Sequence, residues 1–321
     1  MNSMKKTLAG GMVIGLFVAT GGCGFVVSTA PTIPLGRTPH NGLVASYRLL
    51  YPRHLPSGVK LYQIYYWSRG IKVEAFLSEP TKPGRYPMVV NLHGGAAWSV
   101  DTTHVAFGYG LPLLTALARS TTVMVYPEYQ GYLGSAGTVR GLKTNVANTL
   151  AAMRIAHMFG EVRRHDTYLW GYSMGGGVAL MTAAVDHHVK AVVAVSPFVG
   201  LTDVASWAGA HPTLALQGDV FGQLARISAA YGQAIHSAAY RERSPDASRI
   251  TAPVLLLQGT ADHHVAWQTV LLFAHQMEAA HRTVKLVLYP GGHHGRYSAK
   301  SNAQIDRWFA RYGLRLNFGG H

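Results

Sequence analysis

Three side chains suited to acyl transfer occur in the sequence, each beside a turn that contains glycine. Ser173 lies at the centre of Gly171–Gly175, a G-x-S-x-G motif between an apolar run and a helical pattern. Asp262 and His294 follow later apolar runs, in that chain order. A serine hydroxyl becomes a nucleophile when a histidine takes its proton, and that histidine needs an acid to fix its tautomer. The order serine, acid, histidine is typical of hydrolases with a nucleophile elbow.

Each of these assignments has an alternative in the sequence. Asp262 could instead cap the helix that follows it, and Asp203 is a second candidate acid. His293 and His294 are adjacent, so only one of them can point at Ser173. Other serines after apolar runs lack the flanking glycines and are interpreted as turn or cap residues, namely Ser99, Ser135 and Ser196.

A tetrahedral acyl intermediate also needs backbone N–H groups that hold its oxyanion. The residue after the nucleophile, Met174, is expected to supply one of them. The second is expected from the segment Asn91–Ala96 (NLHGGA), through Gly95 or Ala96, with His93 supporting the loop. The alternative is a glycine turn without a catalytic role.

Histidine doublets raise the question of a metal site. They occur at His187-His188, His263-His264 and His293-His294, with no H-E-x-x-H motif and no clustered cysteines. We therefore predict neither a metal nor a cofactor.

The elements that must position these residues alternate between strand and helix patterns. A hairpin is expected from Val59–Trp67 and Ile71–Ser78. Further strands are expected at Pro87–Leu92, Thr121–Tyr126, Thr167–Trp170, Ala191–Val195, Pro253–Gln258 and Val284–Tyr289. Helices are expected at Leu111–Ser120, Lys143–Phe159, Met174–Val185, Val265–Ala280 and Asn302–Tyr312. This alternation predicts an α/β fold with a mostly parallel sheet covered on both faces, whose reactive groups lie at the carboxyl ends of the strands.

One connection in this pattern is too long to be a simple loop. Residues 198–249 are rich in Gly, Ala, His and aromatic residues and are expected to form a small helical cap inserted into a domain that spans residues 42–321. An ordinary pair of helices on the flank of the sheet is the alternative.

The first residues have the pattern of an export signal. Lys5-Lys6 precede the apolar segment Leu8–Ala19, which is too short to cross a bilayer, and small residues then lead to Cys23. We expect a signal peptide over residues 1–22, lipidation of Cys23 and a tether over residues 23–41, which would place the protein in the periplasm or cell envelope. Plain cleavage and an uncleaved anchor are the alternatives, and the single cysteine excludes an internal disulfide.

The formal charge of +14 arises because acids are scarce (14) beside 28 bases. No run of five or more Lys and Arg occurs, which argues against a nucleic-acid partner. An anionic membrane surface or an acidic medium fits this balance equally well.

Several segments resemble the α/β-hydrolase superfamily, in its branch near the prolyl-oligopeptidase catalytic domain and dienelactone hydrolase-like esterases. The matching segments are NLHGG (91–95), YPEYQGYLGSAG (126–137), GYSMGG (171–176), SPDASRITAPVLLLQGTADHHV (244–265) and YPGGHHG (289–295). The resemblance implies a mostly parallel sheet of about eight strands and a triad of Ser173, His294 and Asp262. It also favours His294 over His293, because the last segment is similar to the family pattern Y-P-G-x-x-H-G.

Two departures from the family bear on the substrate. The usual Asp-Tyr-Arg-Gly is Glu128-Tyr129-Gln130-Gly131, and the chain has no room for the large propeller of the oligopeptidases. These departures put peptidase activity in doubt and shift weight toward esters, so we expect an exported serine hydrolase that cleaves carboxylic esters. A small peptidase or amidase is the alternative, followed by a non-catalytic, lipid-anchored envelope protein.

Overall fold

The computed structural model describes residues 42–103, 105, 110–159, 162–215, 218–295 and 298–316. The expected signal peptide (1–22), the tether (23–41) and Cys23 lie outside the described residues. Within the described part of the chain, no helix is both long enough and apolar enough to cross a membrane.

In the described ranges, short runs rich in valine, leucine and aromatic residues form a sheet of nine strands in the order β1-β2-β3-β5-β4-β6-β7-β8-β9. The first three strands and β5 pair antiparallel, and the strands from β5 across to β9 are parallel. The α/β class and the mostly parallel sheet are therefore confirmed, with one strand more than the eight expected. Their bounds are Val44–Leu50 (β1), Val59–Ser68 (β2), Ile71–Pro80 (β3), Tyr86–Leu92 (β4), Val123–Pro127 (β5), Val162–Tyr172 (β6), Val189–Val195 (β7), Val254–Gly259 (β8) and Val284–Tyr289 (β9).

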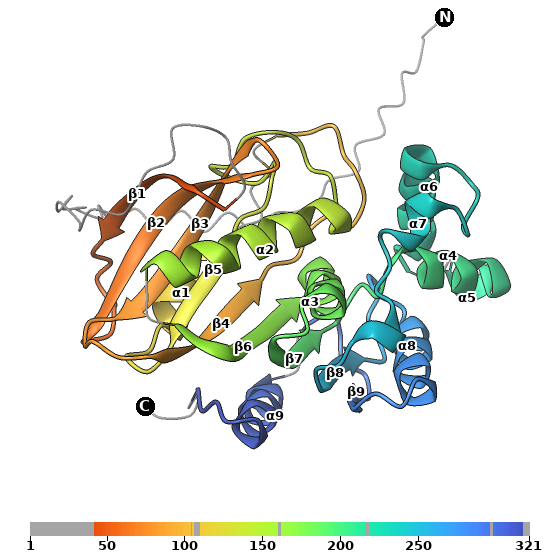
Figure 1. The fold of residues 1–321 in the computed structure, drawn as a ribbon. Coiled ribbons are helices and arrows are strands. Elements are labelled where there is room, and N and C mark those ends of the chain that lie inside the picture. The colour runs from red at the N-terminus through yellow and green to blue at the C-terminus, as the bar shows by residue number, and fades with distance from the viewer. Residues whose placement is uncertain are drawn as a thin grey trace, which may run out of the picture.

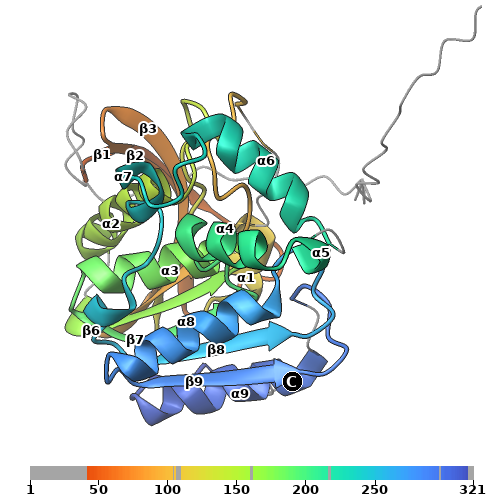
Figure 2. The same cartoon turned by 90° about the vertical axis from the view of Figure 1, so that its right-hand side faces the viewer.

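Helices cover both faces of this sheet (Figures 1 and 2). Alternate residues of the central strands enter two separate apolar clusters: Val90 and Leu256 pack on one side, and Val89 and Leu255 on the other. One cluster includes residues of α2 (Leu142–Phe159), α3 (Met174–Val185) and α8 (Trp267–Ala279). The other includes residues of α1 (Gly110–Leu117) and α9 (Ser298–Arg311).

The long connection between β7 and β8 is helical, as expected. It contains α4 (Leu201–Ala210), α5 (Pro212–Ala215), α6 (Val220–Tyr231), α7 (Ala238–Arg241) and a 3-10 turn at Ala247–Arg249. Helix α4 packs against α8, and the group lies at one end of the sheet (Figure 2).

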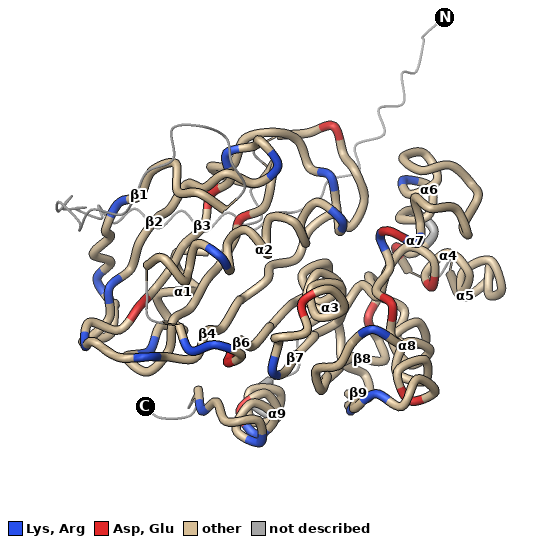
Figure 3. Tube along the Cα trace, viewed as in Figure 1, with Lys and Arg blue, Asp and Glu red and all other residues tan. Residues whose placement is uncertain are grey.

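The basic residues are spread over the fold. Figure 3 shows Lys and Arg on many elements of the described chain, with no single helix or strand that gathers them.

Candidate active site

The polar groups singled out in the sequence meet at the carboxyl edge of the parallel strands. Ser173 directly follows β6, Asp262 lies three residues after β8, and His294 lies five residues after β9. The loop that begins at His93 follows β4 of the same sheet. Because the carboxyl ends of parallel strands share one edge, four distant segments of sequence contribute to one site.

The turn around Ser173 is tightly constrained. Ser173 has φ 55° and ψ −122°, a backbone conformation that costs a non-glycine residue on the order of 1–3 kcal/mol. Its N–H donates to the carbonyl of Val195 at 2.9 Å, and its carbonyl accepts from the N–H of Phe198 at 3.0 Å. A Cβ at Gly171 would lie 2.1 Å from the carbonyl oxygen of Gly175, and one at Gly175 would lie 2.0 Å from that of Leu92. Sterics therefore require both glycines of the motif.

His294 lies between the serine and the acid. Its Nε2 is 3.0 Å from Ser173 Oγ, and its Nδ1 is 2.7 Å from Asp262 Oδ2. A carboxylate only accepts, so the histidine N–H is on Nδ1, and the lone pair of Nε2 can accept the serine proton. This geometry allows proton transfer from Ser173 to a histidine whose orientation the acid fixes.

Asp262 is held ionised by its hydrogen bonds. Its side chain is fully buried, and burial alone would raise the pKa. The hydrogen bond and charge of His294, and the backbone N–H groups of Val265 and His264 at 2.9 Å each, outweigh burial and place the pKa below its usual value. Asp262 thus orders the loop before α8 but does not cap that helix, which begins at Trp267 after the N-cap residue Ala266; the capping alternative was wrong.

The competing residues lie elsewhere. Asp203 is on α4 and accepts a hydrogen bond from Gln276 of α8 at 3.3 Å. His293 is exposed, and its Nδ1 is 3.1 Å from the carbonyl oxygen of Ala261. The structure therefore brings His294 and Asp262 to Ser173 and brings neither alternative there.

Among the expected oxyanion donors, Ala96 differs from the other two. Its N–H donates to the hydroxyl of Tyr132 at 2.9 Å. Met174 is the first residue of α3, and an N–H at that position has no partner within its own helix. For the N–H of Gly95, no partner occurs among the described residues. The hydrogen bonding thus favours Met174 and Gly95 over Ala96.

His93 is buried and uncharged, and its ring contacts the backbone of the loop that contains Gly95. Its Nδ1 is 2.6 Å from the carbonyl oxygen of Gly94, and its ring packs against Tyr126, Tyr129 and Tyr132. Burial lowers the pKa of His93 to about 4, although hydrogen bonds with the backbone oppose the shift.

The acid beside that ring, Glu128, is also mostly uncharged at neutral pH. Burial and the neighbouring Glu74 raise the pKa of Glu128 to about 8. Its Oε2 lies 3.8 Å from His93 Nε2, but at neutral pH the imidazole is unprotonated and the acid is mostly protonated. This contact is therefore packing between neutral groups rather than an ion pair.

Two polar residues that sequence reasoning did not assign to the site contact Asp262. Ser196 Oγ donates to Asp262 Oδ2 at 3.0 Å and accepts from the N–H of Gly295 at 3.1 Å, so it links the acid to the loop that carries His294. Gln258 Nε2 donates to the same carboxylate oxygen at 3.0 Å. The position of Ser196, directly after β7, was the signal that could have found it.

Aromatic rings fix the base from two sides. The ring centroid of Tyr172 is 5.1 Å from that of His294, and the ring of His264 is 5.0 Å away in an edge-on arrangement. A Cβ at Gly295, whose φ is 64°, would lie 2.2 Å from the Tyr172 ring. Glycine is thus needed where this loop passes the ring.

The helical insertion borders the site on two sides. The hydroxyl of Tyr231 on α6 accepts from the N–H of Ser99 at 2.7 Å, in the loop beyond Gly95. Gln223 on the same helix donates to the carbonyl of His264 at 2.8 Å. In the described part of the chain, no group of three or more His, Cys, Asp or Glu side chains is arranged to hold a metal.

Known proteins are similar to this chain in sequence. The sequence profile of the prolyl oligopeptidase family matches residues 141–314. A protein of Bacillus subtilis named "Uncharacterized peptidase YtmA" is 25% identical over 259 residues, which cover 79% of this chain and 93% of the relative.

Solved structures are similar in fold at lower identity. Acetyl xylan esterase 1 from Thermoanaerobacterium has a TM-score of 0.59 at 19% identity, covering 84% of this chain and 88% of that one. The acylaminoacyl peptidase of Pyrococcus horikoshii has a TM-score of 0.64 at 15% identity, covering 86% of this chain but 49% of that one. These likenesses confirm the α/β-hydrolase fold.

Proposed function

The chain belongs to the prolyl oligopeptidase family of serine hydrolases, and we propose that it cleaves small carboxylic esters through an acyl-enzyme formed on Ser173. The observation that carries the proposal is the pair of contacts at His294, 3.0 Å from the serine hydroxyl and 2.7 Å from the carboxylate of Asp262.

In the proposed reaction, Ser173 Oγ attacks the acyl carbon while His294 Nε2 accepts the hydroxyl proton. The N–H groups of Met174 and Gly95 hold the developing oxyanion. His294 then donates its proton to the leaving alkoxide, and the carbon–oxygen bond of the ester breaks to release an alcohol. Water then gives a proton to the same histidine and attacks the acyl carbon; the bond from that carbon to Ser173 Oγ breaks, His294 returns the proton to Oγ, and the carboxylic acid is released.

An ester substrate is favoured over a peptide by the small size of the helical insertion beside Ser173 and by the length over which the neighbouring structures match. The insertion is a group of short helices, and the esterase neighbour is matched along 88% of its length, whereas the peptidase neighbour is matched along 49%. The family name and the Bacillus subtilis relative support the second candidate, a small peptidase or amidase.

The two candidates separate in one assay. We expect p-nitrophenyl acetate and butyrate to be turned over with a kcat/KM at least about tenfold above that of aminoacyl p-nitroanilides, with all turnover lost in Ser173→Ala. Faster anilide turnover would favour the peptidase, and full ester turnover in Ser173→Ala would contradict the site.

We also propose export and a lipid anchor at Cys23, on the basis of the basic, apolar and small-residue segments that precede this cysteine. The wild-type protein should then sediment with membranes, and Cys23→Ser should release it into the soluble exported fraction. Equal partition of both proteins would contradict the anchor.

A further inference from the structure

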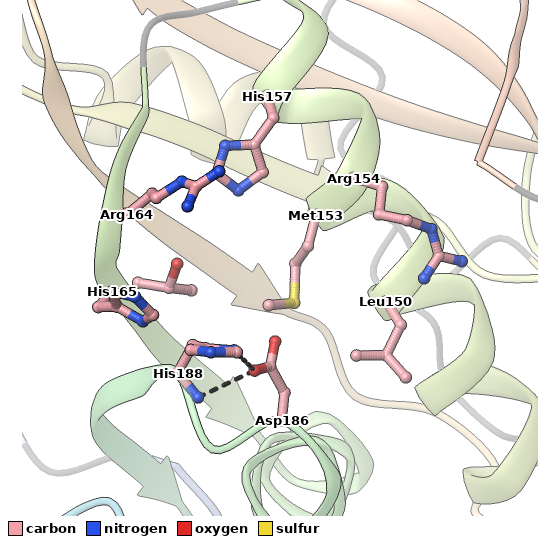
Figure 4. A pocket seen from close by; sticks show the side chains of 9 residues that line it. Leu150, Met153, Arg154, His157, Arg164, His165, Asp186 and His188 are labelled. Atoms are coloured by element: carbon pink, nitrogen blue, oxygen red, sulfur yellow. Dashed lines mark hydrogen bonds and ion pairs between the residues drawn. The ribbon is translucent and has the colours of Figure 1, made fainter.

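A solvent-open hollow of about 530 Å³ lies at the end of the sheet opposite Ser173 (Figure 4). It is formed by the second half of α2, the start of β6 and the turn after α3. Because these segments lie at the amino ends of parallel strands, the hollow is separate from the proposed active site. Its volume falls within the roughly 300–1,000 Å³ of small-molecule pockets.

The titratable groups that line it are mostly cationic or imidazole. Figure 4 shows Arg164 and His157 extending from one wall and His188 and Asp186 closing the opposite side. Asp186, the acid of this lining, already accepts from the backbone N–H of His188 at 3.0 Å and lies 3.1 Å from its ring Nδ1. Arg154 and His165 complete the polar wall.

Both arginines have unused hydrogen-bonding capacity. Among the described residues, neither Arg154 nor Arg164 forms an ion pair. The charge of Arg164 acts on the other groups of the hollow. Burial lowers the pKa of His157 most, the positive charge of Arg164 lowers it further, and the negative charge of Asp186 opposes both. Guanidinium groups bind planar or tetrahedral oxyanions through paired N–H donors.

The wall is also conformationally strained. His165 has φ 56°, a region that costs a non-glycine residue on the order of 1 kcal/mol, and its ring lies against that of His188 with centroids 4.4 Å apart. Strain of this kind is concentrated at ligand sites. Thr167 and the apolar side chains of Leu150 and Met153 form the remaining lining, and the apolar pair suits a ligand with a carbon portion beside its charge.

We propose that this hollow binds a phosphate group, carried either by a small soluble phosphate ester or by a phospholipid headgroup. Two guanidinium groups and three imidazole rings line it, and the carboxylate of Asp186 lies 3.1 Å from His188 Nδ1. The headgroup is included because Gly42, at the start of the described chain, lies against Arg154: a Cβ on Gly42 would be 2.8 Å from Arg154 Nε. The segment from Cys23 to Gly42 spans at most roughly 65 Å, so a lipidated Cys23 would keep the hollow near the membrane.

The test uses the full chain and two charge-matched double variants. Arg154→Gln/Arg164→Gln removes both guanidinium groups of the hollow, and Arg53→Gln/Arg315→Gln removes two exposed arginines outside its lining. Pyrophosphate binding is measured by calorimetry, and sedimentation is measured with phosphatidylcholine vesicles containing 20% or no phosphatidylglycerol. Melting curves and ester turnover check that each variant is folded.

We expect pyrophosphate or anionic vesicles to bind the wild type and the control variant within twofold of each other, and the Arg154/Arg164 variant at least tenfold more weakly. Selective loss of pyrophosphate binding alone assigns a soluble phosphate, and selective loss of vesicle binding assigns a headgroup. Equal weakening in both double variants, or no binding of either probe by the wild type, would overturn the proposal. Arg154→Lys/Arg164→Lys, which keeps the charge but loses the paired donors, should bind with intermediate strength.

Discussion

Replacing Ser196 with alanine should slow catalysis although this residue is buried and is not the nucleophile, the base or the acid. Its hydroxyl donates to Asp262 Oδ2 at 3.0 Å and accepts from the N–H of Gly295 at 3.1 Å. The variant therefore removes one donor to a buried carboxylate and leaves the neighbour of His294 without its acceptor. A hydrogen bond to a charged group contributes about 1.5–3 kcal/mol.

If the variant loses about 2 kcal/mol of transition-state stabilisation from this hydrogen bond, kcat should fall about 30-fold. KM should change less than about twofold, because the binding surface is untouched. The loss should not be larger, since Gln258, His264 and Val265 still donate to the carboxylate.

The assay is steady-state turnover of p-nitrophenyl acetate, with Ser244→Ala as the control. Ser244 Oγ likewise makes two hydrogen bonds: it accepts from the N–H of Thr202 at 2.9 Å and donates to Thr202 Oγ1 at 3.1 Å. Ser244 lies in the helical insertion, away from Asp262. Melting temperatures show whether both variants are folded. Equal kcat values in the two variants, or a loss expressed only in KM, would refute the positioning role of Ser196.

The base, the buried acid and the glycine loop give three further predictions. His294→Gln should lower kcat at least about 10³-fold while His293→Gln stays within about threefold, and similar losses in p-nitrophenyl acetate turnover would contradict the choice of base. The fold raises the pKa of Glu128 to about 8, so the folded state is destabilised progressively as pH rises from about 4.5 to 8. Glu128→Gln should therefore raise the melting temperature more at pH 8.5 than at pH 5. An equal change at both pH values would show that ionisation of Glu128 is not responsible. Gly95→Ala should lower kcat at least tenfold because its Cβ would lie 2.4 Å from a tyrosine hydroxyl, whereas Gly232→Ala, with φ 77° and open space, should affect stability alone; unchanged turnover in Gly95→Ala would remove that loop from the site.

The parallel part of the fold was predictable because each strand is a short apolar run beside glycine or proline. The range Val284–Tyr289 was predicted to the residue, and the helix after Ser173 was placed correctly at Met174–Val185. The edge strand Val44–Leu50 was missed because its interior residues alternate between half-buried and exposed and carry mixed polarity. Edge strands face solvent on one side, so their sequences lack a continuous apolar signal.

The candidate site was predictable to the extent that it follows strand ends. Ser173, Asp262 and His294 each lie just after a parallel strand, and the structure brings them within hydrogen-bonding distance. The contact between Tyr132 and the N–H of Ala96 could not be foreseen, because it joins loops from two strands that are distant in sequence. From the sequence alone, neither Gly95 nor Ala96 could be excluded as the second oxyanion donor. The fold distinguishes them, because the N–H of Ala96 already donates to the Tyr132 hydroxyl.

The most direct test of the central proposal is covalent labelling of the serine. The wild-type protein should react stoichiometrically with a fluorophosphonate probe, with the adduct located by mass spectrometry on the peptide that contains Ser173. Labelling should fall at least about 10³-fold in His294→Gln, because Nε2 of that residue lies 3.0 Å from the serine hydroxyl and accepts its proton. An adduct on another residue, or undiminished labelling in Ser173→Ala, would contradict the assignment of Ser173 as the nucleophile.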